Sequence, residues 1–420
     1  MTDVAGRAEA RIEEAGSVLV APPERWAEQP VREFLGTRTT PEQLAAGEVD
    51  PTGRSVYLYG GESGVEERRL RAAERVFVVR EQDGAADGGP DRGPDGGAAD
   101  GAPWPVVGPG RMPARVHGLG VYYRRFFDPA DGHFARIGAE HAFQSLTEST
   151  KPGTAHRSGI YLTPVRRDGA ELHFRLLRCS TNLSGPTEGF RATDTRIVEE
   201  LNREAAAVLR DQAPLNHVLA QIYHNTPAGE GRRQSKARIS AHADKTKDMP
   251  ANGIMAFCTF YDRLDGLEPL PGDAHDLGVR GVSALTGLRF RLKERTAHTD
   301  AAGLPPDFTL TLHPGSVLLV PLSTNRLYTH EIRPSALPAE RLPTRLGYVV
   351  RCSDAEAVHR EGRTFLKTGQ GPVALEPPTQ DGMDELRRSY AEENRGTSVV
   401  DYAGQPPFSM NAGDYLAPRP

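Results

Sequence analysis

This sequence has few cysteines, no long apolar run and only a small net charge. Its 420 residues include three cysteines, Cys179, Cys258 and Cys352, and none of them forms a Cys-x-x-Cys pair. This pattern argues against a disulfide framework or a thiolate zinc site and fits a reducing compartment. No apolar run reaches the roughly eighteen residues of a membrane span, and the N-terminal segment lacks the apolar core of a signal peptide. We therefore expect a soluble, cytoplasmic protein without a membrane partner.

Charge and motif content narrow the function classes further. The formal net charge of −5 provides no overall attraction to nucleic acid, although a local basic groove is compatible with it. A nucleic-acid partner is therefore less favoured but stays open. The sequence contains no Gly-x-Gly-x-x-Gly motif after a strand pattern, no Walker loop and no Gly-x-Ser-x-Gly motif. It offers none of these common nucleotide-binding or hydrolase signatures.

Changes in composition divide the chain into four regions. Residues 1–80 form a mixed region in which VYLYGG and VFVVRE predict strands and the first sixteen residues predict an amphipathic helix. Residues 81–110 are rich in Gly, Asp, Ala and Pro, and this composition predicts a disordered insertion. We expect the main domain over 111–352. Residues 353–420 form a C-terminal extension that wraps the core or acts as a partial lid.

Short strands dominate the second half of the main domain. Eight segments are rich in β-branched or aromatic residues and are separated by Gly, Pro, Asn or Asp: IYHNT, ARISAHA, GIMAFCTFYD, GLRFRLK, FTLTLH, SVLLVPL, RLYTHEI and RLGYVVRCS. This spacing predicts an antiparallel sandwich or barrel. Before them, apolar residues at helical spacing over 197–209 predict a helix. The expected fold class is a β-rich α+β protein with flanking helices.

A His-x-acid spacing occurs three times, at His242 and Asp244, His298 and Asp300, and His359 and Glu361. Residues two positions apart on a strand point to the same side, so one strand end can supply two metal ligands. A non-haem Fe(II) site needs two imidazoles and one carboxylate on one face of the metal. The first pair ends a strand segment, ARISAHA, and is followed by a histidine on a later strand segment, His330 in RLYTHEI, and then by an arginine-flanked strand. No histidine follows His359.

The arginine-flanked strand is TRLGYVVRC, with Arg345 at one end and Arg351 at the other. A buried guanidinium group facing a metal cavity suits a carboxylate, because it donates two parallel hydrogen bonds. Ordinary roles stay open for each candidate: a surface turn for His242 and Asp244, a core histidine for His330, and solvent-facing arginines.

In order and in local sequence, these motifs resemble the Fe(II)/2-oxoglutarate-dependent dioxygenase superfamily, specifically its AlkB-like branch. ARISAHADK and RLYTHEI are similar to the ligand-bearing motifs of that branch. The resemblance covers about 215–352 and implies a double-stranded β-helix, a jelly-roll, cupin-like core. It implies that His242, Asp244 and His330 bind Fe(2+) and are catalytic. It also implies that 2-oxoglutarate binds Arg345, Arg351 and Tyr223, although Gln221 stands where the family has asparagine.

The implied activity is a dioxygenase reaction in which O2 and 2-oxoglutarate are consumed, succinate and CO2 are released, and the substrate is hydroxylated. The AlkB-like resemblance points to demethylation of nucleic acid. The acidic charge and the absence of a base-stacking platform favour a small-molecule hydroxylase instead, in specialised metabolite biosynthesis. Nucleic-acid or protein oxidation remains the alternative, and a non-catalytic β-barrel binding protein is a third hypothesis.

A cluster of basic residues surrounds the first His-x-acid motif: Arg232, Arg233, Lys236, Arg238, Lys245 and Lys247. It has two interpretations. One is a solvated loop; the other is a rim that attracts an anionic small-molecule substrate or a nucleic-acid backbone. The sequence does not predict the oligomeric state.

Overall fold

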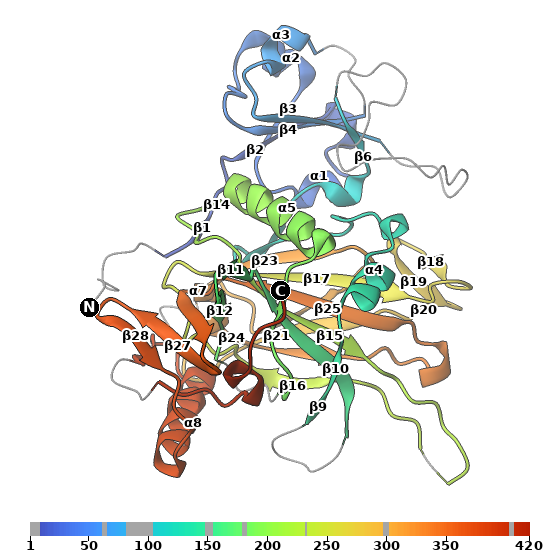
Figure 1. The fold of residues 1–420 in the computed structure, drawn as a ribbon. Coiled ribbons are helices and arrows are strands. Elements are labelled where there is room, and N and C mark those ends of the chain that lie inside the picture. The colour runs from blue at the N-terminus through green and yellow to red at the C-terminus, as the bar shows by residue number, and fades with distance from the viewer. Residues whose placement is uncertain are drawn as a thin grey trace.

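The computed structural model describes residues 9–60, 65–80, 104–147, 154–178, 183–231, 233–296, 302–402 and 407–420. These residues form a mostly-sheet α+β structure (Figure 1). Cys258 and Cys352 are free and buried, while Cys179 lies outside the described residues. Over the described ranges, no helix combines the length and the apolar character needed to cross a membrane.

Each of the eight predicted strand segments overlaps a strand, although IYHNT shares only Ile222 and Tyr223 with its strand, and these eight strands lie in two sheets. They are β15 (His217–Tyr223), β16 (Ile239–His242), β17 (Ile254–Asp262), β21 (Gly287–Leu292), β22 (Asp307–Thr311), β23 (Val317–Pro321), β24 (Tyr328–Arg333) and β25 (Thr344–Arg351). Four of them are adjacent in a nine-stranded sheet in the order β15-β25-β17-β23, and the other four form a sheet in the order β16-β24-β21-β22. A short helix that the sequence did not predict, α7 (Leu322–Leu327), joins β23 to β24.

Alternate side chains of the nine-stranded sheet enter two different cores. On β25, Leu346, Tyr348 and Val350 pack into a core that also contains α4 (His133–Glu140) and α5 (Ala192–Val208). On the other face, Tyr223 and Phe257 pack with residues of the four-stranded sheet. The two sheets therefore face each other, and the helices cover the outer face of the larger one. Helix α5 is the helix predicted from apolar spacing.

The nine-stranded sheet extends beyond those four strands. It includes β7 (Ala114–Val116), β8 (Gly120–Tyr123), β9 (Gln144–Thr147), β10 (Thr154–Thr163) and β13 (Glu188–Gly189). A separate five-stranded sheet contains β11 (Arg166–Asp168), β12 (Glu171–Leu176), β26 (Ala355–Arg360), β27 (Arg363–Thr368) and β28 (Gly371–Ala374). A small sheet is formed by β18 (Glu268–Leu270), β19 (Asp273–Val279) and β20 (Val282–Ser283). The long C-terminal helix is α8 (Gln380–Arg395).

The N-terminal region forms a parallel sheet of its own (Figure 1, blue). Its order is β3-β2-β4-β5-β6, from β2 (Ser17–Val20), β3 (Thr37–Thr39), β4 (Ser55–Tyr59), β5 (Arg75–Val79) and β6 (Val106–Val107). Its short helices are α1 (Gln29–Glu33), α2 (Pro41–Ala46) and α3 (Glu67–Leu70), and separate apolar clusters occupy the two faces of the sheet. Strands β4 and β5 match the two predicted strands.

Two N-terminal expectations need comment. The helix expected in the first sixteen residues is not formed in the described part, where β1 (Arg11–Ile12) pairs instead with β14 (Leu209–Arg210). Residues 81–103 of the predicted insertion lie outside the described residues. The end of that segment contains β6, which pairs in parallel with β5.

A buried carboxylate on α5 connects the N-terminal sheet to the main sheet. Glu204 is 1% exposed. Its Oε2 accepts a 2.8 Å hydrogen bond from Arg75 on β5, and its Oε1 accepts a 2.7 Å bond from the Tyr123 hydroxyl on β8. A buried carboxylate is costly unless it is paired, so these two bonds fix the position of α5 between the sheets.

We predict that Glu204→Ala lowers the free energy of unfolding by about 3 kcal/mol, because it leaves the Arg75 charge without its buried partner. Chemical denaturation measures the effect. Glu199→Ala, at an exposed position of the same helix, is the matched control and should change stability by less than about 0.5 kcal/mol. Equal stability of the two variants would contradict a role for this ion pair.

Candidate metal centre

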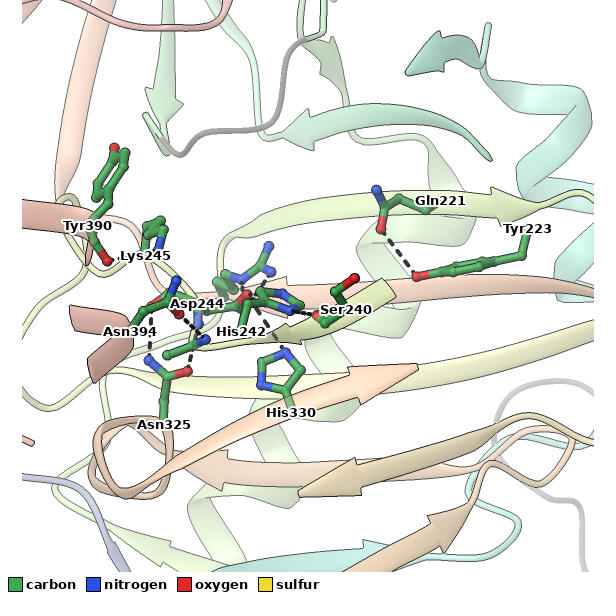
Figure 2. Close-up of polar contacts among 12 residues, drawn as sticks. Gln221, Tyr223, Ser240, His242, Asp244, Lys245, Asn325, His330, Tyr390 and Asn394 are labelled. Atoms are coloured by element: carbon green, nitrogen blue, oxygen red, sulfur yellow. Dashed lines mark hydrogen bonds and ion pairs between the residues drawn. The ribbon is translucent and has the colours of Figure 1, made fainter. Parts of the chain in front are cut away.

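His242, Asp244 and His330 converge at one end of the four-stranded sheet (Figure 2). His242 is the last residue of β16 and lies opposite His330 of β24 in the strand register. One possible ligand atom of each residue lies within 4.8 Å of the others. The Asp244 Oδ1 atom is 3.5 Å from the His242 Nε2 atom and 3.9 Å from the His330 Nε2 atom. Strand pairing therefore positions both imidazoles, and the carboxylate follows two residues later.

The local electrostatics suit metal ligands. Burial, followed by the effect of His242, lowers the pKa of His330 to about 3, so its imidazole is neutral at pH 7. Burial by itself would raise the pKa of Asp244, but Arg351 holds that pKa well below its usual value. A neutral imidazole and an ionised carboxylate are the forms that bind metal ions. Two histidines with one carboxylate are typical of non-haem Fe(II) sites.

Arg351 holds the Asp244 carboxylate from the facing sheet. Its Nε and Nη2 atoms donate hydrogen bonds of 3.0 and 2.7 Å to the Asp244 Oδ2 atom. The Oδ1 atom is thus left facing the two imidazoles. The His242 Nδ1 atom lies 2.9 Å from the Ser240 carbonyl oxygen, to which an Nδ1–H group would donate, so the Nε2 lone pair is directed toward Asp244. Both contacts orient the donor atoms toward one point.

Two asparagines that the sequence did not single out hold the backbone at Asp244 (Figure 2). The side chain of Asn325, on α7, accepts a 2.8 Å hydrogen bond from the Asp244 N–H and donates a 3.0 Å bond to the Asp244 carbonyl. The Asn394 side chain, on α8, accepts a 2.6 Å bond from the Ala243 N–H. Asn325 and Asn394 lie far along the chain from Asp244, so no local motif signals their contacts.

Helix α8 also contacts the residues after Asp244. The Glu393 Oε1 atom accepts a 3.1 Å hydrogen bond from the Thr246 N–H. Lys245 donates through Nζ to the Tyr390 carbonyl oxygen at 3.2 Å. The predicted C-terminal extension therefore supports the segment that carries Asp244.

Several side chains of the basic cluster contact other parts of the protein and do not face the cavity. Lys236 Nζ donates hydrogen bonds of 2.8 and 3.0 Å to the Ser335 and Leu337 carbonyls. Lys247 lies over the Phe408 ring, and burial lowers the pKa of Lys247 to about 8. Among the described members, Lys245 alone lines the cavity next to the metal centre, and Arg232 lies outside the described residues.

The three converging residues border a cavity of about 120 Å³ between the two sheets. Arg345, Arg351 and Tyr223 line the same cavity, so all six residues singled out in the sequence meet there. A space of this size holds several water molecules. Apolar side chains form much of its remaining wall: Leu177, Leu219, Ile239, Phe257, Leu288, Leu312, Ile332 and Val349.

Arg345 is 4% exposed, and its Nε and Nη2 atoms have no hydrogen-bond partner among the described residues. Its guanidinium carbon lies 3.8 Å from the centre of the Tyr223 ring. Gly347 leaves room for it, because a Cβ atom there would lie 2.8 Å from the Arg345 Nη1 atom. Unpaired charge is costly to bury, so this arrangement favours binding of an anion.

The other His-x-acid pairs do not form a comparable group in the described residues. His298 and Asp300 lie outside those residues. His359 lies in the separate five-stranded sheet, where its Nδ1 atom is 3.0 Å from the Thr364 hydroxyl.

A second histidine–carboxylate cluster contains Glu140, His141 and Asp194. The His141 Nδ1 atom is 2.9 Å from Glu188, and its Nε2 atom is 2.8 Å from Asp194. Asp194 also accepts a 2.8 Å bond from the Tyr348 hydroxyl. Both imidazole nitrogens are thus already paired, and we interpret the group as a structural network.

Comparison with known proteins gives little further guidance. No protein-family model and no curated protein matches the chain. A solved structure of the non-heme alpha-ketoglutarate-dependent epimerase SnoN from nogalamycin biosynthesis is 11% identical and covers 57% of this chain and 80% of its own, with a TM-score of 0.29. A Pseudomonas putida prolyl-4-hydroxylase is 11% identical and covers 55% of this chain and 91% of its own, with a TM-score of 0.26. These scores are too low to carry a functional argument.

We predict that Asn325→Ala weakens binding of Co(II) or Mn(II) about tenfold, because it releases both backbone groups of Asp244. Losses of 10- to 100-fold are typical when a residue that orients a metal ligand is removed. Equilibrium dialysis measures the Kd. The control is Asn252→Ala, since that side chain also bonds a backbone carbonyl but lies outside the cavity lining. A Kd within about twofold of the unaltered protein would show that Asn325 does not position Asp244.

We predict that the His141 network stabilises the protein below about pH 6.5 and that this stabilisation is lost as the pH rises. Burial opposes protonation of His141, but its hydrogen bonds to Asp194 and Glu188 prevail and raise its pKa. The stabilisation is complete below the pKa of histidine in the unfolded chain. It disappears as the pH rises through the higher pKa of His141 in the folded protein. Urea denaturation between about pH 6 and about pH 9 should show this decline, and His141→Gln should lack it. If the free energy of unfolding changes with pH in the same way in both proteins, His141 is not charged in the folded state.

Proposed function

We propose that this protein is an Fe(II)- and 2-oxoglutarate-dependent oxygenase that hydroxylates a small-molecule substrate. One observation carries the proposal: a buried guanidinium group with unpaired nitrogens, that of Arg345, shares a cavity with a two-histidine, one-carboxylate cluster. The order of the ARISAHADK, RLYTHEI and TRLGYVVRC motifs supports a place in the AlkB-like branch of that superfamily.

We also propose that β15 to β25 include the eight strands of a double-stranded β-helix, or jelly roll. Consecutive core strands alternate between two facing antiparallel sheets for most of this segment, as expected for a double-sheet jelly roll. In this arrangement the metal centre lies between the sheets. His242 and His330 come from the smaller sheet, and Arg345 and Arg351 from the larger.

The residues present fit both groups that the proposal requires. His242, Asp244 and His330 would hold Fe(II), since they offer two imidazole nitrogens and a carboxylate oxygen. Arg345 would bind the distal carboxylate of 2-oxoglutarate, with its guanidinium held against the Tyr223 ring. When bound, iron and 2-oxoglutarate supply the oxidising chemistry, in which O2 and 2-oxoglutarate are converted to succinate and CO2 and a substrate C–H bond becomes C–OH.

The other cavity residues would tune and shield the centre. Arg351 keeps Asp244 ionised and leaves one of its oxygens directed at the imidazoles. Phe257, Leu219 and Leu288 supply an apolar wall that limits water around the reacting groups. The acidic net charge of the chain favours a small-molecule substrate over nucleic acid, and oxidation of nucleic acid or protein is the alternative.

We predict that anaerobic addition of Fe(II) and 2-oxoglutarate to the protein produces a visible charge-transfer band. His242→Ala should lose this band, because one imidazole ligand is removed, while His359→Ala should retain it. Absence of the band in the unaltered protein would refute the oxygenase proposal. Succinate formation stimulated by methylated oligonucleotides, and not by small organic molecules, would overturn the choice of substrate class.

A further inference from the structure

A fourth cationic side chain lines the cavity beside those already discussed. Arg157 lies on β10, directly opposite Tyr223 of β15 in an antiparallel register. Directly opposed residues of an antiparallel pair project from the same face of a sheet. Arg157 therefore points to the same side as Tyr223, toward the cavity that it lines.

Two of the other three cations have an anion or an acceptor, and the proposed function supplies an anion for the third. Arg351 is paired with Asp244, and Lys245 donates to the Tyr390 carbonyl. Arg345 would be neutralised by 2-oxoglutarate under the proposed function. Arg157 has neither a hydrogen bond nor an ion pair with any residue that the structure describes. One positive charge in the cavity is thus left for a further ligand.

Tyr223 lies between Arg157 and Arg345, the arginine proposed to bind 2-oxoglutarate. Along the sheet, Arg157 of β10, Tyr223 of β15 and Arg345 of β25 occupy one row, with Tyr223 in the middle. Two strand spacings place the backbones of the two arginines about 10 Å apart. Arg345 lies against the Tyr223 ring and over Gly347, so it is directed along β25 and not toward Arg157. The two guanidinium groups are therefore suited to different anions.

Apolar side chains line the same cavity as Arg157. Leu219 lies four residues along β15 from Tyr223, on the same face of the sheet and opposite Tyr161 of β10, and Leu177 follows β12. Both leucines line the cavity. A ligand with one anionic group and an apolar body would satisfy the free guanidinium and the leucines together.

We propose that the substrate is a small organic acid and that Arg157 binds its carboxylate, which makes Arg157 the residue that sets substrate specificity. This inference rests on the proposed function and names the substrate class of the same site. The carboxylate end lies at Arg157, and the apolar body extends along Leu219 toward the metal centre.

The test uses protein loaded anaerobically with Fe(II) and saturating 2-oxoglutarate. The probes are matched pairs, each a carboxylic acid beside its primary amide: hexanoate with hexanamide, and 3-phenylpropanoate with 3-phenylpropanamide. Binding is followed through the change in the charge-transfer band and by calorimetry. We expect each acid to bind at least about tenfold more tightly than its amide, as for a charge-assisted hydrogen bond. Arg157→Gln should remove that preference, Arg157→Lys should retain part of it, and the exposed control Arg166→Gln should keep it.

Three results would overturn the inference. The first is equal or undetectable binding of acid and amide by the loaded protein, and the second is an unchanged acid preference in Arg157→Gln. The third is a rise in the Kd for 2-oxoglutarate in Arg157→Gln as large as in Arg345→Gln, because Arg157 would then bind the cosubstrate. Failure of the proposed function is distinguishable, since in that case the unaltered protein forms no charge-transfer band before any probe is added.

Discussion

The ion pair between Asp244 and Arg351 is the contact on which the candidate metal centre depends. Asp244 follows a strand of the four-stranded sheet, and Arg351 ends a central strand of the nine-stranded sheet, so the pair connects the two sheets at the cavity. Both side chains are buried, and a buried charge that loses its partner is strongly destabilising. The pair uses the Asp244 Oδ2 atom and leaves Oδ1 near both imidazoles. The ion pair and the candidate metal site thus use different oxygens of one carboxylate.

Strand β25 shows how one segment serves both core and cavity. It lies between β15 and β17, so its alternate residues face two interiors. Leu346, Tyr348 and Val350 pack under the helices, while Arg345, Gly347 and Arg351 face the cavity. Gly347 leaves room for the Arg345 guanidinium, because a Cβ atom there would lie 2.8 Å from the Arg345 Nη1 atom. Packing of the alternate apolar residues therefore fixes the positions of the residues between them, which face the cavity.

The sequence predicted the parts of this protein that local patterns determine. Eight of the strands between β15 and β25 overlap segments expected from β-branched runs and turn residues, whereas β18, β19 and β20 were not expected. The six residues singled out from the order of their motifs line one cavity: His242, Asp244, His330, Arg345, Arg351 and Tyr223. The parallel N-terminal sheet was missed. Two of its strands have three or four residues, and β6 joins it from beyond a Gly- and Asp-rich segment. Pairing between such distant short segments leaves no periodic signal.

Supporting residues of the site were missed for a related reason. Asn325 and Asn394 bond backbone groups, and a backbone amide has the same chemistry at every position, so no residue pattern near Asp244 reveals its partners. Arg157 lies far from the metal motifs in sequence, and the pairing of β10 with β15 brings it to the cavity. The basic cluster had two interpretations, and its members differ: Lys236 and Lys247 are held against carbonyls and an aromatic ring, while Lys245 lines the cavity.

The two kinds of support at the metal centre have different physical origins. His242 and His330 are held by strand pairing, which fixes both backbones through a regular ladder. Residues 243–246 follow the strand and have no ladder partner. Three of their four N–H groups donate instead to side chains: Ala243 to Asn394, Asp244 to Asn325 and Thr246 to Glu393. Because a ligand on a loop needs such support to keep its geometry, α7 and α8 supply for Asp244 what the sheet supplies for the histidines. The C-terminal helix therefore supports the candidate metal centre in the same physical sense as the strands, although it contributes none of the three candidate ligands.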